Sequence, residues 1–164
     1  MNVRQQSGAR LNVLLTESHP HAPEHWTTQL PRLLAPQGVA AYVARSGREA
    51  IDLAERVQLH AAVIDLSTPL GDDEHNPVAR HGSSDTRSPA GIWLLELFRR
   101  LPNQPPVVVV RGPAVSARQF DRLMREALRL DAFSVVNKPV DLEQMLAVFR
   151  RLIDRRYRGA WPGS

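Results

Sequence analysis

Apolar residues gather in five short runs, each five or six residues long, and longer stretches of mixed character separate them. The runs are rich in β-branched side chains, and the fourth, 106–110 (PVVVV), is apolar on both faces. Because helices cover both faces of a buried parallel sheet, such continuous runs are typical of its strands. We therefore predict strands at residues 11–16, 39–44, 61–66, 106–110 and 133–137.

The stretches between the runs place apolar side chains three and four residues apart, which is the repeat of a helix. They predict helices at residues 24–35, 46–57, 91–101, 116–128 and 141–153. Ser46 with Glu49, and Asp141 with Gln144, have the spacing of N-terminal helix caps. Pro31 lacks a backbone N–H, so we expect the first helix to kink there or to begin late.

Five strands that alternate with five helices predict an α/β fold, a doubly wound five-stranded parallel sheet with helices on both faces. In such a sheet, ligands bind at the carboxyl ends of the strands, near the switch in strand order. The residues that follow the strands are therefore the first candidates for a functional site: Glu17, Ser18, Asp65, Arg111, Gly112 and Lys138.

A single domain accounts for most of the 164 residues. We assign residues 1–10 to a flexible N-terminus, 11–157 to the domain and 158–164 to a C-terminal tail. Residues 67–89 mix Gly, Ser, Asp, His, Pro and Arg without a period, which predicts a long, poorly ordered insertion loop. The chain has no cysteine, no apolar run as long as a membrane span and no signal-like N-terminus, so we expect a cytoplasmic protein without disulfides.

Composition draws attention to Lys138. The chain has 21 basic side chains and a formal charge of +4, and Lys138 is its single lysine. It follows the fifth predicted strand, where its compact, flexible ammonium group can reach a carboxylate or a phosphoryl oxygen. Asp65 ends the third predicted strand, and an anion at the end of a buried apolar run is unfavourable unless pairing or function compensates. The two residues together predict a polar site at this edge of the sheet.

With these motifs the chain resembles the receiver domains of two-component response regulators, as an atypical, degenerate member. That family has an acidic pair after the first strand, Asp after the third, Thr or Ser and a small residue after the fourth, and Lys-Pro after the fifth. The corresponding positions of this chain are Glu17-Ser18, Asp65, Arg111-Gly112 and Lys138-Pro139. The resemblance covers residues 11–153 and implies a flavodoxin-like sheet with the strand order 2-1-3-4-5.

The resemblance also implies a chemistry for these positions. Asp65 would be the phosphoacceptor, and it would take a phosphoryl group from a histidine kinase or a phosphotransfer protein. Lys138 would bind the phosphoryl oxygens, Arg111 would occupy the switch position, and the small Gly112 would leave the pocket open. Such a module would then act through contact with a separate effector protein.

A metal ion is the second implication of the resemblance. Mg²⁺ would be held by Glu17, Asp65, the backbone carbonyl of Ser67 and, weakly, Ser18. Ser18 stands where the family has a direct carboxylate ligand, and a neutral hydroxyl is a poor ligand for a hard dication. We therefore expect Mg²⁺ binding to be weak or absent.

Two further departures concern signal transmission. Arg111 stands where the family has a hydroxyl, and a guanidinium group can bind a carboxylate through two hydrogen bonds, so we expect it to contact Asp65 or Glu17. Val135 replaces the usual aromatic residue, so we expect the family's rotamer switch to be absent. Phe133 has the same strand parity and could substitute for it, although a core position is the simpler interpretation.

These observations predict a stand-alone receiver-like signalling module that acts by protein–protein interaction and is not an enzyme. A pseudo-receiver that needs no phosphorylation is the alternative, and a homodimer stays open. The basic end of the last helix, residues 150–158, suggests a nucleic-acid-binding protein as a rival, but Asp154 interrupts it and we do not expect nucleic acid or membrane as partners. A phosphate-handling enzyme is disfavoured because the sequence has no Gly-rich phosphate loop.

Overall fold

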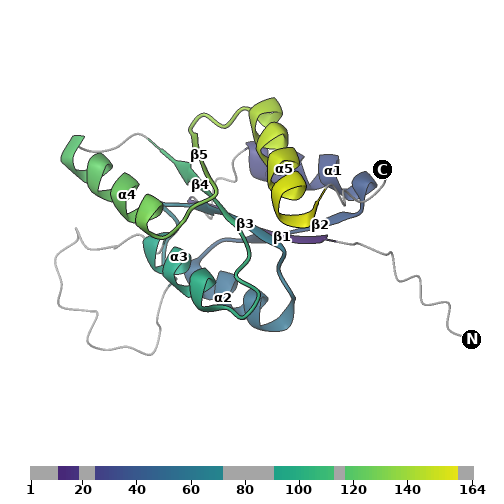
Figure 1. Ribbon diagram of the computed structural model, residues 1–164, viewed down its shortest axis with the longest axis horizontal. Coiled ribbons are helices and arrows are strands. Elements are labelled where there is room, and N and C mark those ends of the chain that lie inside the picture. The colour runs from purple at the N-terminus through teal and green to yellow at the C-terminus, as the bar shows by residue number, and fades with distance from the viewer. Residues whose placement is uncertain (1–10, 19–24, 72–90, 113–116, 159–164) are drawn as a thin grey trace, which may run out of the picture.

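The five apolar runs form one parallel sheet with the strand order β2-β1-β3-β4-β5 (Figure 1). The computed structural model describes residues 11–18, 25–71, 91–112 and 117–158. The strands are β1 (Leu11–Thr16), β2 (Val39–Ala44), β3 (Ala61–Asp65), β4 (Val107–Arg111) and β5 (Ser134–Asn137). The predicted doubly wound α/β fold with the order 2-1-3-4-5 is therefore confirmed.

Helices cover both faces of this sheet, as Figure 1 shows. They are α1 (His25–Leu34), which continues into the short helix η1 (Ala35–Gln37), α2 (Gly47–Arg56), α3 (Gly91–Arg100), α4 (Ala117–Arg129) and α5 (Leu142–Tyr157). Helices α1 and α5 pack on one face, and α2, α3 and α4 pack on the other. Among the described residues, no helix combines the length and the apolar character needed to cross a membrane.

Alternation along the central strands fills the two halves of the core. Val63 and Val108 turn toward α1 and α5, whereas Ile64 and Val109 turn toward α2, α3 and α4, and all four are fully buried. Complete burial of such a side chain contributes about 1.5–3 kcal/mol. A strand apolar on both faces is thus anchored from both sides, and the residue that ends it has a fixed position.

The predicted helix caps are confirmed. The Ser46 side chain accepts a hydrogen bond from the Glu49 backbone N–H at 3.2 Å, and the Asp141 side chain accepts one from Gln144 N–H at 2.8 Å. Pro31 lies inside α1, which nevertheless begins at His25, so the expected late start is wrong.

The first five residues of the predicted insertion loop, 67–71, form neither a helix nor a strand. Residues 67–71 are held by hydrogen bonds, because the carbonyls of Pro69 and Leu70 accept from Gly47 N–H at 2.8 Å and Arg48 N–H at 3.0 Å. Those N–H groups open α2 and have no partner inside the helix, so the loop satisfies them. Residues 72–90, like 1–10 and 159–164, lie outside the described residues, where the prediction is not tested.

The expected parity of Phe133 is also wrong. Strand β5 begins at Ser134, one residue after Phe133. Phe133 consequently packs on the side of α1 and α5, whereas Val135 packs on the side of α2, α3 and α4. Phe133 belongs to the core and cannot replace an aromatic residue at position 135.

Candidate functional site

The carboxyl ends of β1, β3, β4 and β5 bring the predicted site residues to one edge of the sheet. Asp65 is the last residue of β3 and Arg111 the last of β4. Ser18 lies two residues after β1, and Lys138 directly follows β5 and is joined to Pro139 by a cis peptide bond. The structure therefore groups residues that lie up to 120 positions apart in sequence.

Asp65 is the buried anion of this group, with an exposed fraction of 0%. Its Oδ1 accepts a hydrogen bond from the Ser67 backbone N–H at 2.8 Å. Its Oδ2 accepts no hydrogen bond from the described residues, and it lies 2.5 Å from Lys138 Nζ as an ion pair. One carboxylate oxygen is thus fixed by the backbone, and the other faces a cation that a flexible side chain carries.

Lys138 links Asp65 to the end of β1. Its side chain is 15% exposed, and Nζ also donates a hydrogen bond to Ser18 Oγ at 2.8 Å. A side chain at Gly112 would place its Cβ 3.6 Å from Lys138 Cδ, so Gly112 lies directly beside the lysine stem. The predicted reach of Lys138 to a carboxylate is confirmed, and Ser18 serves the lysine as an acceptor.

Glu17 is buried next to this group, but its carboxylate is turned to helix α1. Glu17 Oε1 accepts a hydrogen bond from Thr27 Oγ1, and Glu17 N–H donates to the Ala44 carbonyl at 3.0 Å. Both Glu17 and Thr27 are less than one-twentieth exposed. Thr27 could not be predicted from the sequence, because a hydroxyl group in a helix has no pattern of its own.

Two further buried hydroxyl groups, on Thr16 at the end of β1 and on Thr68 after β3, were also not predicted from the sequence. Thr16 Oγ1 accepts a hydrogen bond from the Asp65 N–H at 2.9 Å. Thr68 Oγ1 donates to the Asp65 carbonyl at 2.7 Å, and the two hydroxyl oxygens lie 2.8 Å apart. Both threonines are completely buried, so Asp65 is enclosed by polar contacts that start from its own backbone.

The expected contact of Arg111 with Asp65 or Glu17 is not observed. Within the described residues, the ion pair of Asp65 comes from Lys138, and Glu17 is engaged by Thr27. Arg111 is tied to the site through its backbone, because its carbonyl accepts from Lys138 N–H at 2.8 Å. The end of a strand fixes the Cα of a residue but not the direction of a long side chain, which explains the wrong prediction.

The donor set of the described residues does not fit a tight Mg²⁺ site. It offers two carboxylates, Asp65 and Glu17, and no group of three or more potential metal ligands occurs in the described parts of the chain. One oxygen of Glu17 is engaged by Thr27, and Ser18 accepts from Lys138. Since Mg²⁺ prefers octahedral oxygen ligation with carboxylates, weak or absent binding stays our prediction.

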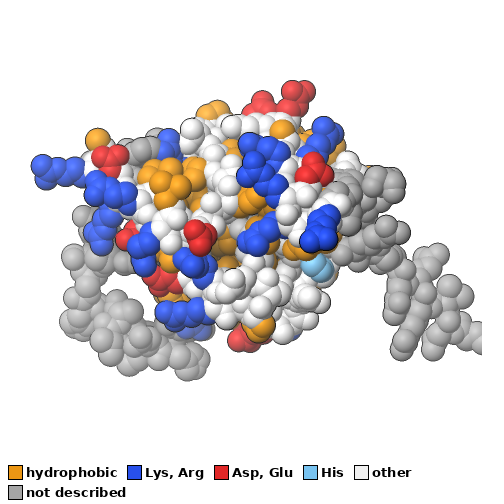
Figure 2. All heavy atoms as spheres, in the orientation of Figure 1, with side chains coloured by type: hydrophobic (Ala, Val, Ile, Leu, Met, Phe, Trp, Pro, Cys, Tyr) orange, Lys and Arg blue, Asp and Glu red, His pale blue; other side chains and the backbone are white. Residues whose placement is uncertain are grey.

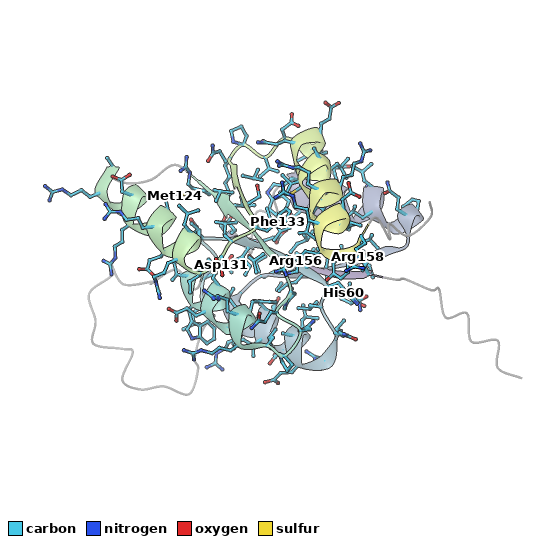
Figure 3. All side chains as sticks on the ribbon, in the orientation of Figure 1. His60, Met124, Asp131, Phe133, Arg156 and Arg158 are labelled. Carbon is cyan, nitrogen blue, oxygen red and sulfur yellow. The ribbon has the colours of Figure 1, made fainter. Side chains whose placement is uncertain are left out.

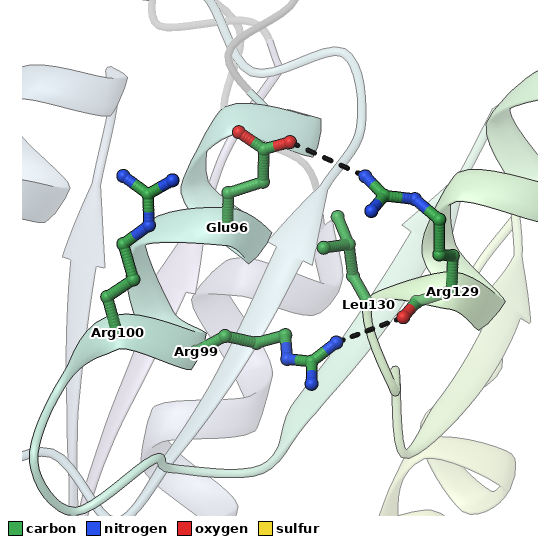
Figure 4. Close-up of a pocket in the computed structure, with 5 residues that line it drawn as sticks. All are labelled: Glu96, Arg99, Arg100, Arg129 and Leu130. Carbon is green, nitrogen blue, oxygen red and sulfur yellow. Dashed lines mark hydrogen bonds and ion pairs between the residues drawn. The ribbon is translucent and has the colours of Figure 1, made fainter.

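A shallow surface pocket of about 300 Å³ lies elsewhere, between α3 and α4 (Figure 4). It is lined by Glu96, Arg99, Arg100, Arg129 and Leu130. Arg129 pairs there with Glu126 at 2.9 Å and with Glu96 at 3.7 Å. Because its charges are largely paired and no residue of the Asp65 group lines it, this pocket is not the candidate site.

Comparisons with known proteins agree with this geometry at the level of the fold. Neither the protein-family models nor the curated protein sequences give a match. The chain is similar to the signal receiver domain of an HD domain-containing protein from Pseudomonas fluorescens Pf-5, with a TM-score of 0.66 and 17% identity over 91% of this chain and 98% of that one.

Two other solved structures extend the comparison. A CheY-like response regulator receiver domain protein from Methanospirillum hungatei JF-1 gives a TM-score of 0.64 and 18% identity over 90% of this chain and 97% of that one. A response regulator from Burkholderia pseudomallei, with a phosphorylated aspartic acid, a calcium ion and citrate, gives a TM-score of 0.59. Its sequence is 21% identical over 92% of this chain and 73% of that one. The chain therefore has the fold of receiver domains.

Proposed function

We propose that this chain is a receiver-like signalling module in which Asp65 accepts a phosphoryl group. One observation carries the proposal: Asp65 Oδ2 is buried, accepts no hydrogen bond from the described residues and faces the single lysine of the chain at 2.5 Å. A buried carboxylate is costly unless it is compensated, and here the compensating charge for Oδ2 comes from a lysine side chain rather than from backbone donors. The phosphorylated aspartic acid of the Burkholderia response regulator supports the same assignment by analogy.

The proposed step is a phosphoryl transfer to Oδ2. The carboxylate oxygen attacks phosphorus and forms a P–O bond, while the bond from phosphorus to the donor breaks and the leaving group takes its electron pair. Imidazole leaves from a phosphohistidine donor and acetate leaves from acetyl phosphate. Lys138 Nζ would exchange its carboxylate partner for a phosphoryl oxygen, which neutralises part of the added charge.

This proposal specifies the class of partner. The donor would be a histidine kinase or a phosphotransfer protein, and the recipient of the signal a separate effector protein or a second copy of the chain. The module itself would turn over no free substrate, so it is not proposed as an enzyme. Signal transmission would not use an aromatic rotamer switch, since Val135 lies on the face of α2, α3 and α4 where such a side chain would be needed.

Transfer from acetyl phosphate tests the proposal directly. Purified protein is incubated with acetyl phosphate and Mg²⁺, and its intact mass is measured. We expect the wild-type chain to gain one phosphoryl group, and Asp65→Asn to gain none. Asp131→Asn is the matched control, because it removes a carboxylate that is 83% exposed and outside the site. Equal labelling of the wild type and Asp65→Asn contradicts the proposal.

A pseudo-receiver that needs no phosphorylation is the second candidate. It is favoured by Lys138, which bonds Ser18 and Asp65 at the same time and so compensates the anion without any ligand. The same experiment separates the two candidates, since a pseudo-receiver gains no mass in any variant.

Nucleic acid is less well supported as a partner. Figure 2 shows the basic side chains of one face interspersed with acidic and apolar ones rather than joined in one patch. Asp154 lies among the exposed arginines of α5, which also reduces the positive field that a phosphate backbone requires. Binding to DNA or RNA that falls steeply with salt near physiological ionic strength would reverse this assessment.

A further inference from the structure

The hydroxyl groups of Thr16 and Thr68 close a ring of hydrogen bonds with the backbone of Asp65. Three contacts define it: Asp65 N–H to Thr16 Oγ1 at 2.9 Å, Thr16 Oγ1 to Thr68 Oγ1 at 2.8 Å, and Thr68 Oγ1 to the Asp65 carbonyl at 2.7 Å. The three residues are completely buried, with exposed fractions of 0%. The ring therefore lies in the interior, around the backbone of the residue that carries the candidate carboxylate.

The direction of each bond in the ring follows from chemistry. A carbonyl can only accept, so the single proton of Thr68 goes to Asp65. Thr68 must then accept from Thr16, whose oxygen in turn accepts from Asp65 N–H. Each hydroxyl donates once and accepts once, and hydrogen bonds arranged in such a chain reinforce one another.

Sheet pairing explains why Asp65 needs this support. The ladder between β1 and β3 ends at the pair Leu15–Val63, two residues before Asp65. On its other side Asp65 is still paired, with Val110 of β4. Thr16 thus supplies, with its side chain, the acceptor that the β1 backbone no longer provides.

We propose that Thr16 and Thr68 are positioning residues that set the reactivity of Asp65. They hold its peptide unit so that Oδ1 meets the Ser67 N–H and Oδ2 faces Lys138. The inference rests on the proposed phosphoryl transfer to Asp65. It adds a buried pair of hydroxyl groups, which do not contact the Asp65 carboxylate themselves, and which hold the attacking oxygen in position.

The two threonines contribute unequally. Thr16→Val leaves Asp65 N–H without its acceptor and Thr68 without its donor. Thr68→Val removes the hydroxyl donor of the Asp65 carbonyl, but that carbonyl keeps one donor, the backbone N–H of residue 68 at 3.0 Å. Since small misplacements of a reacting group lower rates by up to about a hundredfold, we expect Thr16→Val to slow labelling roughly tenfold and Thr68→Val to slow it less. Thr16→Ser keeps the hydroxyl and should stay within about twofold of the wild type.

The experiment measures two quantities in each variant: the initial rate of labelling by acetyl phosphate and the ¹³C chemical shift of the Asp65 carboxyl carbon. Val148→Ala is the control for general loss of stability, because it shortens a buried side chain of α5 that does not touch the ring. Folded fractions are equalised by temperature before rates are compared.

The results separate the inference from the proposed function. A slower rate and a shifted carboxyl signal in Thr16→Val, both restored in Thr16→Ser and absent in Val148→Ala, support the positioning role. An unchanged carboxyl signal in Thr16→Val, or a slowing no larger than that of Val148→Ala, overturns it. A wild-type chain that takes no phosphoryl group overturns the proposed function. The carboxyl signal alone then decides whether the ring positions Asp65: a shift in Thr16→Val supports it and no shift overturns it.

Discussion

His60 lies just before the amino end of β3 and Asp65 at its carboxyl end, and the protein surrounds these two titratable side chains differently (Figure 3 labels His60). The ring atom His60 Nδ1 accepts a hydrogen bond from the Asn12 backbone N–H at 2.9 Å, and the His60 backbone N–H donates to the Asn12 carbonyl at 2.8 Å. The His60 backbone carbonyl accepts a hydrogen bond from the Tyr157 hydroxyl. The two rings meet edge to face, with centroids 6.1 Å apart. Backbone groups and a packed aromatic ring thus contact His60, whereas Asp65 Oδ2 pairs, among the described residues, with the ammonium group of Lys138.

The difference separates a polar residue that joins strands from the residue that we propose as the phosphoacceptor. At the amino end, burial lowers the pKa of His60, so the ring is kept neutral and serves as an acceptor that joins β1 to β3. At the carboxyl end, Asp65 forms a buried ion pair with Lys138, whose ammonium group also donates to Ser18. The first arrangement joins two strands, and the second is the one on which the proposed phosphoryl transfer rests.

Removal of Lys138 should have the largest effect. Lys138→Met leaves Asp65 as an uncompensated buried charge, and breaking such a pair costs about 3–5 kcal/mol in the free energy of unfolding. Urea unfolding measures this loss, and the double variant Asp65→Asn/Lys138→Met should recover most of it. If Lys138→Met alone costs less than about 1 kcal/mol, a typical value for an exposed pair, the buried-pair account is wrong.

Substitution of a glycine near the carboxyl end of β3 should have the second largest effect. A Cβ at Gly91 would lie 2.5 Å from Leu66 Cα, in the backbone next to Asp65, whereas a Cβ at Gly112 would meet Lys138 Cδ at an ordinary 3.6 Å. We expect Gly91→Ala to lower the free energy of unfolding by about 1–3 kcal/mol, because backbone must shift. Gly112→Ala, its matched control, should stay within about 0.5 kcal/mol. Equal thermal stability of the two variants contradicts the close approach.

At the amino end, Tyr157→Phe should have a smaller effect that is confined to stability. It removes the hydroxyl that donates to the His60 carbonyl, which corresponds to about 1 kcal/mol. Acetyl phosphate labelling should not change, since Tyr157 contacts the chain just before the amino end of β3 and Asp65 is at the carboxyl end. Tyr42→Phe, a half-buried tyrosine on β2, is the control for loss of a phenol. A labelling defect in Tyr157→Phe would show that the two ends are coupled.

The smallest effect is the pH dependence of the His60 contact. Because burial lowers the folded-state pKa, the unfolded chain binds the proton first as pH falls. The contribution of His60 is therefore complete above its unfolded pKa of about 6.5 and is lost progressively as pH drops below that value. The difference in melting temperature between wild type and His60→Gln should shrink from pH 8 to pH 5, and a difference that stays constant argues against the neutral ring.

The fold was predictable because apolar patterns are local. The buried runs of β1 and β2 and the caps Ser46 and Asp141 were visible in the sequence with nearly their observed bounds. The ends of the strands were predicted less accurately. The predicted strand began at residue 133 and β5 begins at Ser134, so Phe133 was assigned to the face of the sheet opposite to the one on which it packs. A side chain period of two makes parity sensitive to any such shift.

The candidate site was predictable only where a charge stands out against its surroundings. Asp65 interrupts an apolar run and Lys138 is the single lysine, so both were found. The Thr16–Thr68 ring was not predicted. It depends on the register of β1 against β3 and on the turn after β3, and no sequence pattern indicates either of them. The predicted contact of Arg111 with Asp65 or Glu17 was not found, because strand position does not determine the rotamer of a long side chain.

Chemical mapping of the modified residue tests the central claim most directly. An acyl phosphate, unlike a free carboxylate, is reduced by borohydride to the alcohol, so a phosphorylated aspartate becomes homoserine. The chain is treated with acetyl phosphate, reduced, digested and analysed by peptide mass spectrometry, with an untreated sample in parallel. We predict homoserine at position 65 in the treated sample alone. Homoserine at another aspartate, or at none in a correctly folded chain, would contradict the assignment of Asp65 as the phosphoacceptor.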